Sequence, residues 1–122
     1  MNKIAGFLTG IIAALHLYFL FLEMFLWQTE TGMKVFGMTP EIASHTATLA
    51  KNQGLYNGFL AAGLIWSYFI SNASFQKSVR TFFLTCIVVA GIFGALTAKV
   101  SILYIQALPA LLALISVRFS DD

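Results

Sequence analysis

This 122-residue chain has little charge and few of the residues that punctuate a soluble fold. It contains seven Lys and Arg, five Asp and Glu, two prolines and a single cysteine, Cys86. Charged residues make up 10% of the chain, against about 25% in ordinary soluble domains, which is too few to cover a water-facing surface. One cysteine excludes an intramolecular disulfide and a multi-cysteine metal site. The net charge is +2 and no run of Lys or Arg occurs, so we expect no nucleic-acid partner.

The motifs of common soluble enzymes are missing as well. The chain has no G-x-S-x-G, no H-E-x-x-H, no phosphate loop and no dinucleotide fingerprint. Its two histidines, His16 and His45, are too few to build a metal site. We therefore expect neither a metal nor a cofactor.

The chain is instead rich in long apolar runs. It is 59% hydrophobic, with a mean hydropathy of +0.85. A helix needs roughly 20 apolar residues to cross a bilayer, with about 17 as the lower end. Unpaired backbone groups are not tolerated in lipid, so an apolar run of this length predicts a helix. Four runs qualify: residues 4–26, 54–70, 81–98 and 100–117. The expected fold is all-α, an integral membrane four-helix bundle that forms a single domain over residues 1–122.

Some boundaries are less sharply marked. The third and fourth runs meet at Lys99, where a tight hairpin is favoured over one helix of about 55 Å. The first run is interpreted as a retained anchor helix, because no A-x-A cleavage site follows it. The longer connection, residues 27–53, begins irregularly, but Thr39-Pro40-Glu41 predicts the start of a helical segment. Whether that segment continues into the second membrane helix is left open.

The distribution of Lys and Arg predicts an orientation in the cell membrane. On the face with both termini lie Lys3, Lys77, Arg80 and Arg118, against Lys34, Lys51 and Lys99 on the other. The positive-inside rule then favours cytoplasmic termini, and the short polar stretch 71–80 predicts a cytoplasmic turn.

Small residues recur at the spacing that lets membrane helices approach closely. The pairs are Gly6 with Gly10, Gly54 with Gly58, and Ala90 with Gly94. They favour packing within one chain, surrounded by membrane lipid, and a homo-oligomer is left open.

Polar side chains interrupt the apolar runs at one depth. Glu23 lies inside the first run, and His16, seven residues earlier, shares its helical face. Ionisable groups in membrane segments usually mark a site. With about 1.5 Å of rise per residue, one half of the bilayer receives most of the polar groups: His16, Glu23, Asn52, Gln53, Asn57 and Gln106. These residues predict an outer-half polar pocket.

Four segments also carry a family resemblance. They are Glu23-Met24-Phe25-Leu26-Trp27, Val35-Phe36-Gly37, Asn52-Gln53-Gly54-Leu55-Tyr56-Asn57-Gly58-Phe59-Leu60-Ala61 and Gln106-Ala107-Leu108-Pro109-Ala110. With these, nearly the whole chain resembles a small bacterial integral-membrane family called "domain of unknown function 1304". The resemblance implies a four-helix protein without an agreed reaction, and it adds Trp27, Tyr56 and Pro109 to the marked positions.

Three functions fit these features. In the first, the pocket binds or acts on a lipophilic small molecule, with Glu23 as a catalytic acid or base. The ligand-binding residues would be His16, Trp27, Asn52, Gln53, Tyr56, Asn57 and Gln106. In the second, the polar layer only fixes helix packing in a structural or interaction subunit. The third is a small proton-coupled transporter. The predicted depth of Glu23 argues against this function, because alternating access needs the acid near the middle of the membrane and Glu23 lies close to one surface. Whether the protein is an enzyme stays open.

Overall fold

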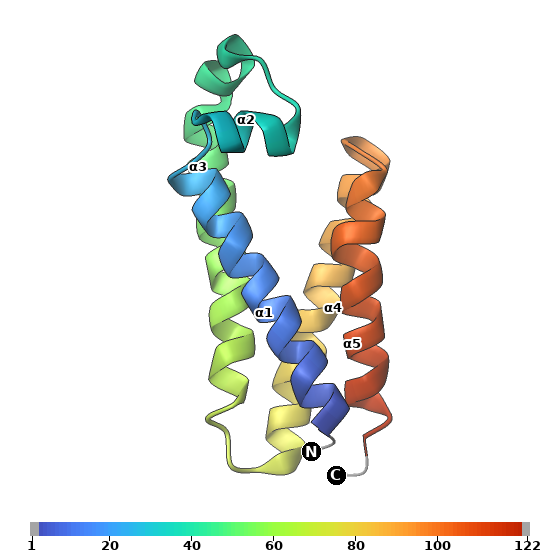
Figure 1. Cartoon of the computed structure of the whole chain (residues 1–122). Coiled ribbons are helices and arrows are strands. Elements are labelled where there is room, and N and C mark those ends of the chain that lie inside the picture. The colour runs from blue at the N-terminus through green and yellow to red at the C-terminus, as the bar shows by residue number, and fades with distance from the viewer. Residues whose placement is uncertain (1–2, 121–122) are drawn as a thin grey trace. The chain divides into compact units, whose positions relative to one another are not determined.

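A computed structural model describes residues 3–120, which are all-helical and contain no strand (Figure 1). The elements follow in this order: α1 (Lys3–Met24), α2 (Glu30–Phe36), α3 (Pro40–Ser67), α4 (Ala73–Thr97), the π-helical turn η1 (Leu103–Ala107) and α5 (Leu108–Arg118). The chain divides into two compact units. The α2 unit holds residues 14–61, and the α4 unit holds the described residues 3–13 and 62–120. Each of α1 and α3 contributes to both.

In the α2 unit, the connection after α1 is more regular than its sequence suggested. The side-chain oxygen of Thr29 accepts a hydrogen bond from the backbone N–H of Gly32 (3.2 Å), and Gly37 ends α2 with a φ of 63°. These are ordinary N-cap and C-cap devices. The irregular start expected for this connection is therefore corrected to a two-turn helix, whose caps could have been recognised.

The helix that begins at Pro40 is continuous. Thr39 caps it, with its hydroxyl oxygen accepting from the N–H of Ile42 (3.2 Å), as its sequence predicted. The helix then passes through Gly54 without a break and ends at Ser67. This resolves the alternative that the sequence left open.

Small residues lie along one face of α3, which meets α1 at Gly54 and Gly58. Ala43, Ala50 and Gly54 are buried at helical spacing. A Cβ atom on Gly54 would lie 2.5 Å from Cγ of Met24 and 3.1 Å from Cβ of Glu23, and one on Gly58 would lie 2.6 Å from Cδ1 of Leu20. The Gly54 and Gly58 pair thus permits close packing between helices of the same chain, as expected.

In the α4 unit, α4 begins earlier than its apolar run. The Asn72 side chain accepts from the N–H of Phe75 (2.8 Å) and caps a helix that starts at Ala73. Most of residues 71–80, which the sequence assigned to a turn, is therefore helical. The reason is that the apolar run marks only the stretch without polar side chains, whereas a good N-cap starts the helix in polar sequence.

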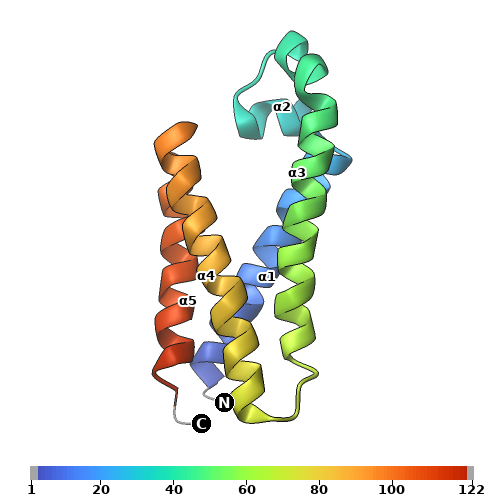
Figure 2. The same ribbon diagram turned by 180° about the vertical axis from the view of Figure 1, so that it is seen from behind.

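The chain then reverses around Lys99, and α4 packs along η1 and α5 (Figures 1 and 2). The backbone of α4 comes so close at Gly91 that a Cβ there would lie 2.6 Å from the backbone nitrogen of Ala107. Gly94 faces Ile102, whereas Ala90 is exposed. The small pair in α4 is thus Gly91 with Gly94 rather than Ala90 with Gly94.

The π-helical turn precedes Pro109. A proline has no N–H for the carbonyl of the residue four positions earlier, here Ile105, and its ring crowds that carbonyl. The turn is widened instead, and the N–H of Leu108 bonds to the carbonyl of Leu103, five residues back. The helix accommodates Pro109 in this way.

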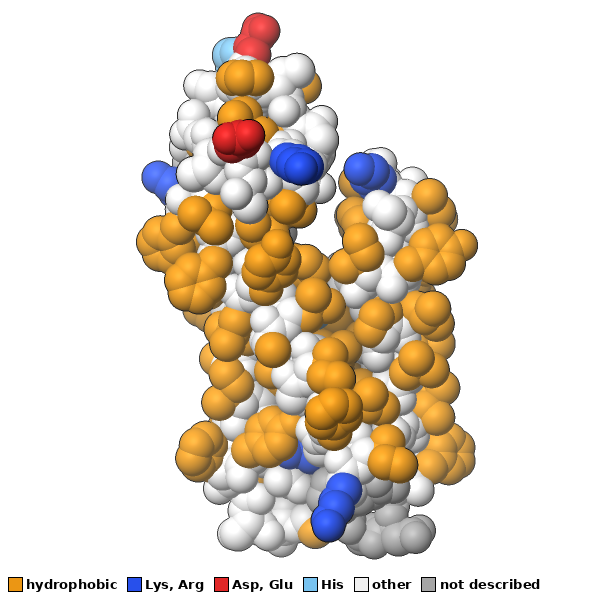
Figure 3. Space-filling model, viewed as in Figure 1, with side chains coloured by type: hydrophobic (Ala, Val, Ile, Leu, Met, Phe, Trp, Pro, Cys, Tyr) orange, Lys and Arg blue, Asp and Glu red, His pale blue; other side chains and the backbone are white. Residues whose placement is uncertain are grey.

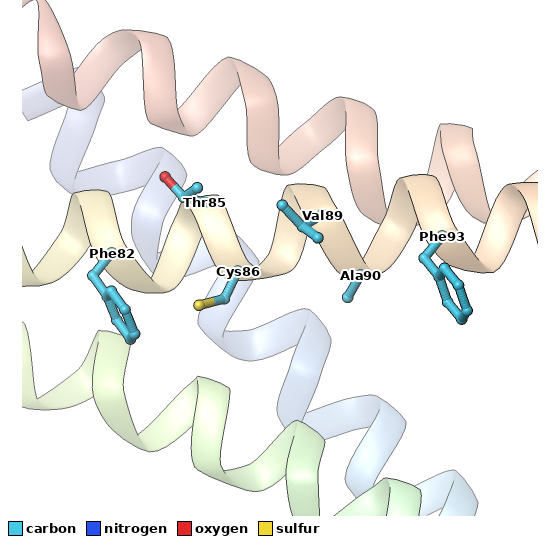
Figure 4. Close-up of a pocket in the computed structure, with 6 residues that line it drawn as sticks. All are labelled: Phe82, Thr85, Cys86, Val89, Ala90 and Phe93. Carbon is cyan, nitrogen blue, oxygen red and sulfur yellow. The ribbon is translucent and has the colours of Figure 1, made fainter.

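Apolar side chains dominate the helix surfaces (Figure 3). Two helices, α1 and α4, are long and apolar enough to cross a membrane, and only 28% of each such stretch is buried. Figure 4 shows part of this surface, a shallow hollow along one face of α4. Its lining is apolar apart from one hydroxyl: Phe82, Thr85, Cys86, Val89, Ala90 and Phe93. None of the polar residues singled out above lines this hollow.

Candidate functional site

A carboxyl and an amide meet where α1 and α3 approach in the α2 unit. Glu23 lies in the last turn of α1 and Asn57 in the middle of α3. The Nδ2 atom of Asn57 donates a hydrogen bond to Oε1 of Glu23 (2.5 Å). Gly54, one turn before Asn57, lies against Cβ of Glu23 and leaves room for this contact. The close approach at Gly54 therefore positions the pair.

Asn57 is the only residue of the α2 unit that hydrogen-bonds to the Glu23 side chain, among the residues described there. Lys51 is a cation of the same unit, yet it makes no ion pair with Glu23. Both Glu23 and Asn57 are partly buried. A carboxyl in this position has an amide beside it but no cation from its own unit.

The pair offers more acceptors than donors to a third group. One N–H of Asn57 is used by Oε1, which leaves its second N–H as a donor and leaves acceptor lone pairs on both Glu23 carboxylate oxygens and on the Asn57 amide oxygen. Because acceptors are in excess, this pair is best matched by a molecule that brings hydrogen-bond donors or a positive charge.

Trp27 contacts residues of α2 and α3. It follows the end of α1, where its indole Nε1–H donates to the hydroxyl of Thr46 on α3 (3.0 Å). Its ring packs against Phe36 at the end of α2, with a centroid distance of 4.7 Å. Trp27 thus ties α2 to α3. Its ring and its only donor are both engaged.

The polar residues of α3 divide between different faces. Each helical residue turns ~100° around the axis, so positions two before and two after Gly54 lie on the side opposite to it. Those positions are Asn52 and Tyr56, and both are exposed. Gln53 is also exposed and lies between the two faces. Hence the structure brings Asn57, but not Asn52 or Tyr56, to Glu23.

His16 and Gln106 are the remaining predicted ligand residues. His16 is fully buried and lies edge-on to Phe19, with ring centroids 5.4 Å apart. Gln106 lies on η1 and belongs to the α4 unit. Within the α2 unit, the structure therefore brings two of the predicted residues, Glu23 and Asn57, into direct contact.

A buried arginine cluster in the α4 unit was missed in the sequence. Arg80, counted among the cations of a cytoplasmic turn, is 1% exposed on α4. Its Nε–H donates to the Ser67 hydroxyl (2.7 Å), and its guanidinium lies 4.2 Å from the ring centroid of Tyr68. Gln76 donates to the Ser67 carbonyl (2.8 Å), and the Tyr68 hydroxyl donates to the carbonyl of Gly6. No sequence pattern near Arg80 predicts this cluster, because the burial of Arg80 depends on which face of α4 is covered by other helices.

Metal binding finds no support in the described residues. Within residues 3–120, there is no group of three or more His, Cys, Asp or Glu side chains that could hold a metal ion.

The close approach at Gly54 leads to a stability prediction. In Gly54→Ala the added methyl group meets Met24, whose side chain can move, but also the Leu20 carbonyl at 3.2 Å. Overpacking of this kind costs about 1–3 kcal/mol, and we expect the lower half of that range. Thermal unfolding in detergent should show the loss.

Gly6→Ala is the matched control, because a Cβ atom on Gly6 would meet nothing within 4 Å. It makes the same change in α1 and should leave the unfolding midpoint unchanged or raise it slightly, since alanine has the higher helix propensity. If Gly54→Ala unfolds at the same temperature as Gly6→Ala, α3 does not approach α1 this closely.

Comparison with known proteins assigns the family. Residues 10–118 match the family described as "Protein of unknown function (DUF1304)". The chain is also 36% identical over 121 residues to "Uncharacterized protein YpaA" of Lactococcus lactis subsp. lactis (strain IL1403), covering 98% of this chain and 100% of the relative. No solved structure matches. The match extends over most of the chain, including all four segments that carried the resemblance, and the protein therefore belongs to the DUF1304 family.

Proposed function

We propose that this protein is a multi-pass protein of the cell membrane in which Glu23 and Asn57 form a binding site for a lipophilic small molecule. The four spanning segments would be α1, the second half of α3, α4, and η1 with α5, with both termini in the cytoplasm. The apolar, largely exposed surfaces of α1 and α4 support insertion, since a soluble protein would cover such helices. The slight excess of Lys and Arg on the side of the termini supports the orientation.

The observation that carries the binding proposal is the Glu23–Asn57 contact. A carboxyl at the end of a membrane-length helix is costly, and such groups usually mark a site. Here its partner in the α2 unit is one neutral amide, which leaves acceptor capacity for a ligand. Leu20 and Met24, which pack against Gly58 and Gly54 at the same helix contact, suit a lipophilic body. The carboxyl and the amide would hold its polar group.

A structural role is the second candidate, because the same contact joins α3 to α1. Interhelical hydrogen bonds in membranes contribute about 0.6 kcal/mol on average, so the pair could serve packing alone. Glu23→Gln separates the two roles. Glutamine keeps an acceptor for the Asn57 N–H and so preserves the packing contact, but it removes the negative charge.

The experiment compares molecules that co-purify with each variant. Wild type and Glu23→Gln are extracted with their surrounding lipid by a maleic-acid copolymer, and bound small molecules are measured by mass spectrometry. We expect at least one lipophilic species to be enriched with wild type and to fall about tenfold or more with Glu23→Gln, at an unchanged unfolding temperature.

Glu30→Gln is the matched control, because Glu30 is an exposed carboxyl on α2 in the same unit. It should retain the species at the wild-type level. If wild type, Glu23→Gln and Glu30→Gln carry the same molecules in the same amounts, the binding proposal fails and the structural role stands.

A further inference from the structure

A second face of α3 carries exposed side chains at coiled-coil spacing. From Ile42 onward, steps of three and four residues alternate up to Phe59 and occupy the a and d positions of a heptad repeat. All members of this row are exposed: Ile42, His45, Leu49, Asn52, Tyr56 and Phe59. We call this row the α3 seam.

The seam lies away from the face that packs on α1. In the same heptad, the buried small residues Ala43, Ala50 and Gly54 fall at the b and f positions. The helix is thus two-sided, with small residues against its own chain and larger side chains on the free side. Such a free side, at heptad spacing, is suited to a second helix.

Part of the seam is apolar where little lipid is expected. With 28 residues, α3 is about 42 Å long, whereas the hydrocarbon core of a bilayer is about 30 Å thick. Ile42 and Leu49 lie in the polar first half of α3, before Gly54, and are 51% and 63% exposed. Burying these two side chains against a partner would be favourable in that region.

Asn52 provides the polar element of the seam. Its side chain makes no hydrogen bond within residues 3–120, and it is exposed next to the apolar half of α3. A single Asn at a heptad core position is known to specify register and oligomeric state, and amides hydrogen-bond across membrane helices. An amide both donates and accepts, so Asn52 can pair with its own copy.

We propose that two copies of this chain associate through the α3 seam as a parallel, in-register dimer. Copies inserted in the same direction are related by a two-fold axis along the membrane normal, so each seam residue meets its counterpart. The positions that flank the seam are Glu41, Thr46, Thr48, Gln53, Leu55 and Leu60. Glu41 is the one charged residue among them. In a parallel coiled coil a residue at a g position faces the e position of the partner helix, so no two like charges face each other across this dimer. The proposal uses only α3 and does not depend on a ligand at Glu23.

Disulfide trapping in native membranes tests this geometry. In a Cys86→Ser background, Leu49→Cys places one thiol in the seam, and Lys51→Cys places one at nearly the same height on the opposite side of the helix. Under mild oxidation we expect Leu49→Cys to give a covalent dimer at a rate at least tenfold above Lys51→Cys. Equal rates, or no dimer from Leu49→Cys, would overturn the proposal.

A charge test needs no cysteine. Asn52→Asp brings two carboxylates face to face in the proposed dimer, whereas Ser44→Asp adds the same charge on the other side of α3, also at an exposed position. Counting of photobleaching steps in liposomes at fixed protein density should show at least a tenfold weaker association for Asn52→Asp and no change for Ser44→Asp. Dimerisation that survives Asn52→Asp, or that falls equally in both, contradicts the in-register contact.

Discussion

Replacing Gly91 by Ala is expected to destabilise the protein more than the same change at Gly94, the other glycine of α4. The new Cβ would lie 2.6 Å from the backbone nitrogen of Ala107, 2.7 Å from its Cβ and 2.8 Å from its Cα. No side-chain rotation can relieve these contacts, because two of the three atoms belong to the backbone. The helices must therefore move apart. Overpacking usually costs about 1–3 kcal/mol, and we expect the upper end, with Gly91→Leu preventing this packing altogether.

The measurement is thermal unfolding in detergent, followed by circular dichroism. Ala90→Leu is the matched control, since Ala90 is the neighbouring residue and is exposed. It adds more volume than Gly91→Ala but should leave the unfolding midpoint nearly unchanged. Gly94→Ala should lie between them, because its Cβ would meet the side chain of Ile102 at 3.2 Å. A Gly91→Ala protein as stable as wild type would show that α4 and η1 do not pack this closely.

The second large effect is expected at Arg80. Arg80→Ala removes a charged hydrogen bond to Ser67 and the contact with the Tyr68 ring, and it leaves a space in a buried region. A hydrogen bond to a charged group is worth about 1.5–3 kcal/mol, and a desolvated cation–π contact about 2 kcal/mol. The cost of burying the charge offsets part of this, so we expect a net loss of about 3 kcal/mol.

Arg80→Lys refines this prediction. Lysine keeps the charge but lacks the planar guanidinium that both donates to Ser67 and stacks on Tyr68, so it should recover only part of the stability. Arg118→Ala, at an exposed position in the last turn of α5, is the control. If Arg80→Ala unfolds at the same temperature as Arg118→Ala, the buried cluster does not stabilise the α4 unit.

The helices were largely predictable because their signals are local. Run length and hydropathy located α1 and α4, and Thr39-Pro40-Glu41 located the start of α3. The errors were local as well. The caps at Thr29, Gly37 and Asn72 start or end helices within polar sequence, where an apolar-run criterion has nothing to detect.

The site was predictable only in part. The sequence by itself determined that Glu23 is a polar interruption in an apolar helix and that Asn57 is a candidate partner, because both follow from the order of residues. Which polar groups meet was decided by the tertiary structure. Gly54 sets the rotation of α3 against α1, so Asn57 turns toward Glu23 while Asn52 and Tyr56 turn away.

Arg80 and Gly91 in the α4 unit also show the difference between what residue type predicts and what packing decides. Residue type suggested an exposed cation and an ordinary helix glycine, yet one is buried beside Tyr68 and the other lies against the backbone of Ala107. Sequence determines which segments are helical and how polar they are, because these properties depend on neighbours along the chain. Burial and partnership depend on the rotation and separation of packed helices, and only the tertiary structure decides those.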